Sequence, residues 1–198
     1  MAWVLVGLGN PGAEYTNTRH NAGRLALEHA CVAFGFGAPK EMPKAKLHVA
    51  RGTLEKSIVV IVLPNTFMNK SGAAVLPYVK SVKQAEHMIV VHDDLDLPLG
   101  RLKVSFDRGS GGHKGIESIA RAVKTTKFVR IRVGVSPSTA AGQTKKPLGE
   151  SAVEKFLLSD FSSNEMKELE AQFSRINEAI KAIVTHGATI AMNEFNRG

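Results

Sequence analysis

Six short hydrophobic runs along the chain have the length and pattern of β-strands. Three of them are apolar almost throughout, which is typical of strands buried on both faces of a parallel sheet. The other three alternate apolar with polar residues, so each is expected to have one face in water. The first group is 3–7, 58–63 and 88–92, and the second group is 47–53, 101–106 and 129–135.

Apolar positions at helical spacing predict four helices between and after these strands. They cover 21–34, 71–83, 115–125 and 163–186. Pro77 interrupts the second pattern, because proline disrupts a helix interior. The last helix begins with a capping box from Ser162 to Glu165, and its apolar stripe is expected to pack in the core. Strands alternating with helices predict a single α/β domain over 1–198, with a twisted, mixed and mostly parallel sheet and helices on both faces.

Two loops are candidates for binding. The segment 136–150, SPSTAAGQTKKPLGE, is the longest stretch without apolar periodicity, and we expect it to be a lid, as long loops in compact domains often are. The glycine-rich segment 109–115, GSGGHKG, precedes a predicted helix. It is either a tight connection between a strand and a helix or an anion site, because helix N-termini favour negative charge.

The composition limits the binding partners and the cellular compartment that can be expected for the protein. The 198 residues carry a net charge of +8, which favours nucleic acid as a partner, although a basic enzyme can carry this excess incidentally. Cys31 is the only cysteine, which rules out an internal disulfide, and its place in an apolar helical stripe predicts a buried, inert thiol. No apolar run approaches the ~20 residues that span a bilayer, and the N-terminus does not resemble a signal peptide. We therefore expect a cytoplasmic protein without a membrane partner.

The positive charges are grouped on two of the predicted strands. In 101–106 and 129–135 cations alternate with apolar residues, so the cations are expected on the wet faces. They are Arg101, Lys103, Arg130 and Arg132. This placement predicts contacts with phosphates, which position a nucleic acid without reading its sequence. The alternative is ordinary solvated charge.

Polar clusters follow each of the three buried strands. They are 10–20, 65–69 and 92–94. Parallel strands would bring these clusters to one edge of the sheet, where open α/β sheets bind ligands. His20 and Asp93 then form the pair expected to act as a general base, because a carboxylate fixes the tautomer of a histidine and raises its pKa. The alternatives are a polar residue at a helix N-terminus for His20 and a solvated acidic turn for Asp94 and Asp96.

Other hydrolytic chemistries lack their motifs. There is no GxSxG for a serine nucleophile, no HExxH or CxxC for zinc, and no phosphate loop beside the acidic residues for magnesium. No metal or other cofactor is therefore expected. The mechanism that remains is hydrolysis by a water molecule that a histidine activates. In this mechanism asparagine side chains would orient the substrate and stabilise an oxyanion. An ester suits such a site better than an amide, because its leaving group is better.

Four ordered motifs, which extend over nearly the whole chain, resemble the bacterial peptidyl-tRNA hydrolase family. They are VGLGNPGAEYTNTRHNAG, NTFMNKSG, HDDLDLPLG and SGGHKGIESI. The resemblance implies a monomeric α/β hydrolase that cleaves the ester between a peptide and the 3′ end of tRNA, and so recycles prematurely released peptidyl-tRNA. It implies no metal, contact with the acceptor arm and 3′ end of the tRNA, and a mobile lid at 136–150.

The resemblance also implies roles for individual residues. His20 would be the general base and Asp93 the residue that orients it. Asn10 would be the amide that helps distinguish N-blocked peptidyl-tRNA from free aminoacyl-tRNA. The positions that would bind peptide, terminal adenosine or tRNA phosphate are Tyr15, Phe67, Met68, Asn69, Lys103, His113, Lys114 and Arg132.

The chain departs from the family pattern at two positions. Lys114 stands where relatives often have asparagine, and an ammonium donates a hydrogen bond but cannot accept one. Its charge would also lower the pKa of a nearby His20. Lys114 therefore either points outward to phosphate or replaces the amide as a donor, and Ser105 stands where relatives can carry a cation. A non-catalytic RNA-binding member of the family and an esterase for small esters remain as alternatives.

Overall fold

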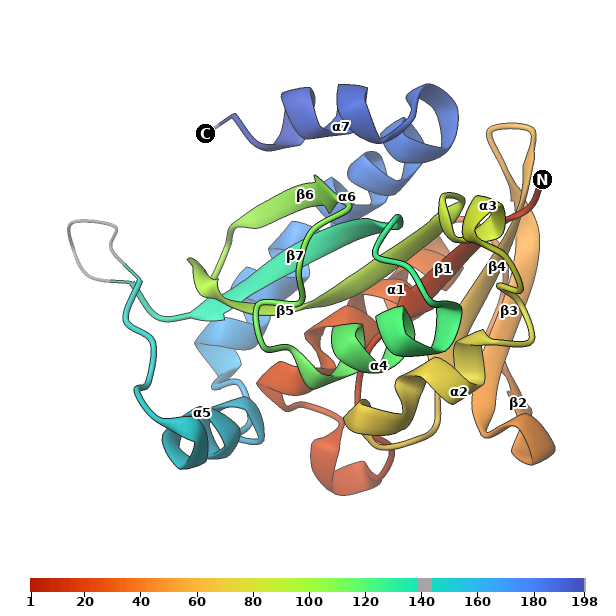
Figure 1. Ribbon diagram of the computed structural model, residues 1–198. Coiled ribbons are helices and arrows are strands. Elements are labelled where there is room, and N and C mark those ends of the chain that lie inside the picture. Colours follow the sequence, from red (N-terminus) through yellow and green to blue (C-terminus); the bar gives the residue numbers. More distant parts are fainter. Residues whose placement is uncertain (139–143, 198) are drawn as a thin grey trace.

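The computed structural model describes residues 1–138 and 144–197, which form a seven-stranded sheet with helices on both faces (Figure 1). The strands are β1 Trp3–Gly7, β2 Lys40–Met42, β3 Leu47–Leu54, β4 Ser57–Pro64, β5 Met88–Pro98, β6 Leu102–Phe106 and β7 Val129–Ser136. Their order in the sheet is β2-β3-β4-β1-β5-β7-β6. Neighbours among the central strands β4, β1, β5 and β7 are parallel, whereas the pairs β2–β3, β3–β4 and β6–β7 are antiparallel. The prediction of a mixed α/β sheet is confirmed.

Seven α-helices accompany the sheet in the described part of the chain. They are α1 Ala22–Ala33, α2 Ser71–Val75, α3 Val82–Ala85, α4 Lys114–Val123, α5 Glu150–Leu157, α6 Ser163–His186 and α7 Ala188–Phe195. Four of them, α1, α2, α4 and α6, cover the two faces of the sheet. On β1, Leu5 packs in one apolar cluster with α1 and α6, while Val4 and Val6 pack in a second with α2 and α4. Figure 1 shows α2 and α4 on the near face of the sheet, with α1 and α6 behind it. Both faces of the central strands are thus covered, which explains their unbroken apolar sequences.

The predicted helix 71–83 is wrong, because this segment forms two short helices. The first, α2, ends at Val75, and α3 begins only at Val82. Pro77 lies in the gap, since proline has no N–H to donate and its ring clashes with the preceding helical turn. The side chain of Ser81 caps α3 by accepting a hydrogen bond from the backbone N–H of Gln84 at 3.2 Å.

Strand β5 is longer than the predicted 88–92 and continues to Pro98. Its pairing with β7 includes Asp93 opposite Val133 and Asp94 opposite Gly134. The interpretation of Asp94 and Asp96 as an acidic turn is therefore wrong, and only Asp96 is exposed to solvent. The carboxylates instead project from a strand, and each is bound by a cation from another segment.

The long helix α6 begins and ends at sequence signals. The Ser162 hydroxyl accepts from the Glu165 N–H at 3.4 Å, and the Glu165 carboxylate accepts from the Ser162 N–H at 2.8 Å. Gly187 ends the helix with a φ of +84°, which favours glycine. The predicted apolar stripe is buried in the core, and Cys31 on α1 is buried beside it. Within 1–138 and 144–197, no helix combines the length and the apolar character that a bilayer crossing requires.

Candidate active site

A cleft of about 1330 Å³ begins beyond the carboxyl ends of β1 and β4 and continues across β5, β7 and β6. Every residue that the sequence analysis identifies as catalytic or substrate-binding lines this cleft. The catalytic candidates lie together at one end, with Tyr15 and Phe67 beside them, and Lys103 and Arg132 lie toward β6. The parallel sheet thus brings together side chains that are far apart in the sequence.

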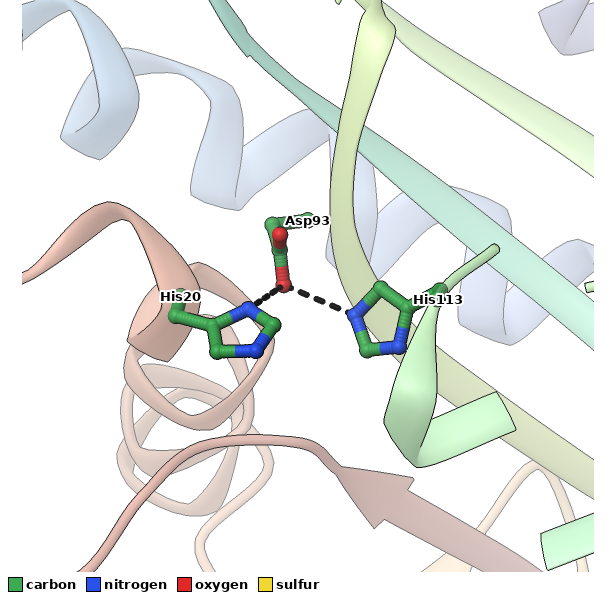
Figure 2. Close-up of side chains that lie close together, drawn as sticks. All are labelled: His20, Asp93 and His113. Atoms are coloured by element: carbon green, nitrogen blue, oxygen red, sulfur yellow. Dashed lines mark hydrogen bonds and ion pairs between the residues drawn. The ribbon is translucent and has the colours of Figure 1, made fainter. Parts of the chain in front are cut away.

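Two histidines bind one carboxylate at the centre of the cleft (Figure 2). Asp93 Oδ1 lies 3.0 Å from His20 Nδ1 and 2.9 Å from His113 Nε2. The Asp93 side chain is 1% exposed and that of His20 is 11% exposed. His20 comes from the 3₁₀ turn Arg19–Asn21 before α1, Asp93 from β5, and His113 from the N-cap of α4. The predicted contact between His20 and Asp93 is therefore formed.

Gly23 explains how the turn that carries His20 comes so close to β5. A Cβ atom at this position would lie 2.1 Å from the carbonyl oxygen of Val91 and 3.0 Å from the Cα of His92. Only glycine lets the first turn of α1 pack on the strand at this distance, since a larger residue would push the two backbones apart. The motif RHNAG therefore sets the distance between the imidazole and the carboxylate.

The charges around His20 act in opposite directions on its pKa. Burial lowers the pKa of His20, but the charge and hydrogen bond of Asp93 outweigh it, so the pKa of His20 lies above its ordinary value. Lys114 lowers the pKa of His20, and Glu154 raises it slightly. Burial works against the charge of Asp93, but His20 and His113 hold the pKa of its carboxyl well below the ordinary range. Asp93 is therefore ionised, and His20 donates its Nδ1–H to it. The Nε2 of His20 has no hydrogen-bond partner among residues 1–138 and 144–197.

His113 is tied to its own helix as well as to Asp93. Its Nδ1 accepts from the N–H groups of Gly115 and Ile116 at 3.1 and 3.3 Å. The ring proton is then on Nε2, which donates it to Asp93. The ligand atoms of His20, Asp93 and His113 lie within 4.8 Å of one another, but a nitrogen that carries a proton is not a metal ligand. The donor set fits a carboxylate held by two N–H groups better than it fits a metal ion.

Asn10 is oriented by the backbone around it. Its Oδ1 accepts from the Met68 N–H at 2.9 Å, and its own N–H and C=O are bound by the side-chain amide of Asn21 at 2.8 and 3.1 Å. This arrangement uses the acceptor end of the Asn10 amide and leaves the Nδ2 donor for a ligand in the cleft.

Aromatic side chains form the rim of the cleft near Asn10. The rings of Tyr15 and Phe67 meet edge to face with centroids 6.4 Å apart, and Phe67 is 56% exposed. Met68 is buried and Asn69 is exposed on the same short turn. A flat base or an apolar side chain can stack on such a rim.

The predicted row of cations on the wet faces of β6 and β7 is only partly correct. Lys103 is exposed, and Arg132 is partly exposed with its Nε bound to Asp94 Oδ2 at 2.6 Å. Arg130 is buried, contrary to the prediction, because the glycine-rich loop covers it and the Gly109 carbonyl accepts from its Nη1 at 2.8 Å. The alternation of apolar and polar residues predicted that Arg130 would be exposed. It is buried because both faces of β7 are covered at this position.

The comparisons with known proteins agree with this geometry. The family model described as peptidyl-tRNA hydrolase matches residues 4–198. The chain belongs to the peptidyl-tRNA hydrolase family. It is 37% identical to the peptidyl-tRNA hydrolase of Thermodesulfovibrio yellowstonii, with 98% of each chain covered. It is likewise 37% identical to that of Aquifex aeolicus, covering 98% of this chain and 96% of the relative.

A solved structure extends the comparison to the fold. The peptidyl-tRNA hydrolase of Acinetobacter baumannii superposes with a TM-score of 0.86 at 32% identity, over 98% of this chain and 94% of that one. As a member of this family, the protein is a hydrolase, and its His–Asp pair gives it the means to activate water.

Lys114 lies at the first position of α4, and its ammonium faces Glu150 at the start of α5. The Nζ to Oε1 distance is 3.6 Å, and the Lys114 side chain is 54% exposed. A second ion pair, Lys146 Nζ to Asp96 Oδ1 at 2.6 Å, joins the predicted lid to β5. Lys114 thus points across the mouth of the cleft, and residues 139–143 of the predicted lid 136–150 lie outside the described residues.

His92 is a site residue that sequence reasoning did not assign. Its Nδ1 donates to the Asp93 carbonyl at 2.7 Å, and its ring meets that of His113 edge to face at 4.7 Å. Burial, with the nearby His113 and Arg130, holds the pKa of His92 well below its ordinary value, so the ring is neutral. The signal was present in the sequence, since His92 directly precedes Asp93 at the end of a buried strand.

Proposed function

We propose that this family member hydrolyses the ester that joins the peptide to the 3′ end of tRNA in peptidyl-tRNA. The observation that carries the proposal is the 3.0 Å contact of His20 Nδ1 with the buried, ionised Asp93 inside a large cleft. The family name supports the substrate, and the net charge of +8 suits a polyanion. The reaction would return tRNA from prematurely released peptidyl-tRNA.

In the proposed mechanism His20 acts as a general base through Nε2. It takes a proton from a water molecule, whose oxygen attacks the ester carbonyl and forms a tetrahedral oxyanion. Collapse of this intermediate breaks the bond to the ribose oxygen, which takes the proton back from the His20 imidazolium. Asp93 remains ionised throughout and stabilises that imidazolium. Asn10 would donate a hydrogen bond to the substrate through Nδ2.

The proposed substrate contacts follow the length of the cleft. The peptide and the terminal adenosine would lie against Tyr15, Phe67 and the 68–69 turn, where stacking is available. The acceptor arm would extend toward β6, where Lys103 and Arg132 would contact its phosphates. His113 would act mainly through Asp93, because its Nε2–H is already used by that carboxylate.

One assay tests the proposed function directly. The protein is incubated with acetyl-aminoacyl-tRNA and with unblocked aminoacyl-tRNA, and free tRNA is measured. We expect turnover of the blocked substrate and little of the unblocked one. Absence of turnover with retained, salt-sensitive binding would favour a non-catalytic RNA-binding protein, which the intact His20–Asp93 pair does not favour. Hydrolysis of small esters that deacylated tRNA fails to inhibit would favour a small-ester esterase.

The proposal also covers how the chain works as a whole. We propose one domain over 1–198 that acts as a monomer in the cytoplasm, in line with the single buried thiol of Cys31. The segment 136–150 would serve as a lid over the cleft, with the Lys146–Asp96 and Lys114–Glu150 ion pairs joining its described part to the cleft walls.

Replacing Lys114 by glutamine should move the acid limb of the pH–rate profile to higher pH. His20 must be neutral to accept a proton, and Lys114 lowers its pKa. Removing that charge raises the pKa of His20, so a higher pH is needed to deprotonate it. The measurement is kcat/KM for acetyl-aminoacyl-tRNA against pH. Lys114→Arg keeps the charge and should leave the limb in place; a shift of the glutamine variant to lower pH would contradict the assignment.

Replacing Lys103 by alanine should raise KM and leave kcat nearly unchanged. An exposed lysine that contacts a phosphate contributes to binding uniformly, and its loss should reduce the slope of log Kd against log salt by about 0.7–0.9. The measurement is tRNA binding and turnover at several salt concentrations. Lys40→Ala, on the edge strand at the opposite end of the sheet, is the matched control. An equal loss of tRNA affinity in both variants would indicate that Lys103 contributes only through the overall charge of the protein.

A further inference from the structure

Arg19, the residue before the proposed base, has its charged group inside the protein. The residue is 7% exposed. Its Nη1 donates to the Ser159 carbonyl at 3.1 Å, to the Ser159 hydroxyl at 2.8 Å and to the Asp160 carbonyl at 2.6 Å. Its Nη2 donates to both carboxylate oxygens of Glu165, at 2.7 and 2.8 Å. One guanidinium thus binds three residues that lie about 140 positions away in the chain.

Two aromatic rings complete the surroundings of this guanidinium. Its central carbon lies 4.6 Å from the ring centroid of Phe156 and 5.2 Å from that of Phe161. The planar guanidinium can stack flat on a ring while its rigid fork of N–H groups donates to several acceptors, whereas a lysine ammonium is a compact charge without such a fork. The site is therefore specific for arginine.

The contacts of Arg19 join two segments of backbone. The Arg19 N–H donates to the Ser159 carbonyl at 3.2 Å, and the Phe161 N–H donates to the Asn17 carbonyl at 3.0 Å. Thr18 and Asp160 form an isolated antiparallel bridge between them. The turn that carries His20 is thus paired with the connection between α5 and α6, and the Arg19 side chain is bound across that pairing.

Helix α5, which this connection anchors, is a wall of the active-site cleft. Val153, Glu154 and Leu157 on α5, with Leu158 after it, line the same cleft as His20. None of the residues on α5 is fully buried, so the helix has little core packing of its own to hold it in place. Its placement relative to His20 therefore depends on the connection that Arg19 binds.

A buried charge of this kind is weak evidence for a role in stability. Desolvation of an ion pair often costs as much as its attraction returns, and apolar replacements of similar volume can be equally stable. The Arg19 Nε is buried and has no hydrogen-bond partner among the described residues, which adds to the cost. Its contacts do, however, fix one defined geometry between two segments.

We infer that Arg19 is a positioning residue for the reaction: it holds α5 against the turn that carries His20, so that the base and the cleft wall keep their relative placement. The inference rests on the proposed function. A shift of about 1 Å in the placement of catalytic groups can cost about 100-fold in rate. Arg19 would therefore affect turnover, although it does not touch the substrate.

The test is Arg19→Lys, which keeps the charge and loses the fork and the stacking. We expect kcat to fall at least about tenfold, with the Kd for tRNA unchanged, when turnover is measured well below the melting temperature of the variant. Phe156→Leu, a milder change that removes one of the two rings, should lower kcat by a smaller factor. If Arg19→Lys folds poorly, the kcat of Phe156→Leu still tests the inference.

Arg24→Lys is the matched control. Arg24 lies on α1 near His20, and its guanidinium binds the Glu28 carboxylate and the Pro64 carbonyl, each at 3.0 Å, and lies 3.3 Å from His48 Nδ1. Among the described residues it has no hydrogen bond to α5. This variant should alter the melting temperature and leave kcat unchanged. Wild-type kcat in folded Arg19→Lys, or losses of kcat that follow the melting temperature equally in all three variants, would overturn the inference. Failure of the proposed function would instead appear as no hydrolysis by the wild-type protein.

Discussion

Replacing His20 by alanine should abolish release of tRNA from acetyl-aminoacyl-tRNA and leave tRNA binding intact. The expected loss in kcat is at least about 10³-fold, since a positioned general base typically contributes about 10²–10⁴-fold and this base also returns the proton to the leaving group. Binding should persist because the imidazole is a small part of a cleft of about 1330 Å³. The measurements are single-turnover hydrolysis and tRNA binding at the same salt concentration.

His186→Ala is the control for this prediction. His186 is exposed in the last turn of α6, outside the cleft, so its removal should change neither turnover nor binding. Residual activity within tenfold of the wild type in His20→Ala would mean that another group removes the proton from water. The mechanism proposed above would then be wrong, even if the substrate were right.

Asp93→Asn should lower kcat by about 10²–10⁴-fold and move the remaining acid limb to lower pH. The carboxylate raises the pKa of His20, so its neutral replacement lowers that pKa, and the imidazole loses its proton at a lower pH. An asparagine amide can also donate to Nδ1 and thereby place the ring proton on Nε2, which removes the base; this wrong tautomer is the main source of the loss. The profile of kcat/KM against pH reports both effects.

Asp107→Asn is a suitable control for the loss of a carboxylate. Asp107 is exposed after β6 and has a φ of +50°, which asparagine also adopts readily. It should leave the position of the acid limb unchanged. If Asp93→Asn retained wild-type turnover, or moved the limb to higher pH, the contact between Asp93 and His20 would not have the role assigned to it.

The sequence predicted those parts of the protein that depend on local pattern. The buried strands, α1, α4 and α6 follow from apolar runs, helical spacing and capping residues. The structure has them within a few positions, except that β5 continues to Pro98. The weak elements β2, α5 and α7 were missed, because short segments with few buried residues leave little pattern. The prediction of one helix over 71–83 was wrong because Pro77 interrupts it. A proline breaks a helix even where the apolar spacing is helical.

The site was partly predictable for a similar reason. Polar residues at the ends of parallel strands must meet at one edge of the sheet, so His20 and Asp93 could be paired from their positions alone. The second histidine on Asp93 could not, because His113 reaches it from a loop whose path no periodicity encodes. The burial of Arg130 was also beyond the sequence, since alternation along a strand cannot show that a loop will cover its polar face.

The sequence by itself determined the order of the main strands and helices along the chain, the family, and the chemical groups available for catalysis. The tertiary structure alone decided that one carboxylate oxygen serves two histidines, that Lys114 faces Glu150, and that Arg19 binds the turn before α1 to the α5–α6 connection. The physical reason is the distance along the chain between the residues that interact. Periodicity and capping involve residues a few positions apart, whereas these contacts join segments about 20 to 146 residues apart, whose approach depends on how the whole chain packs.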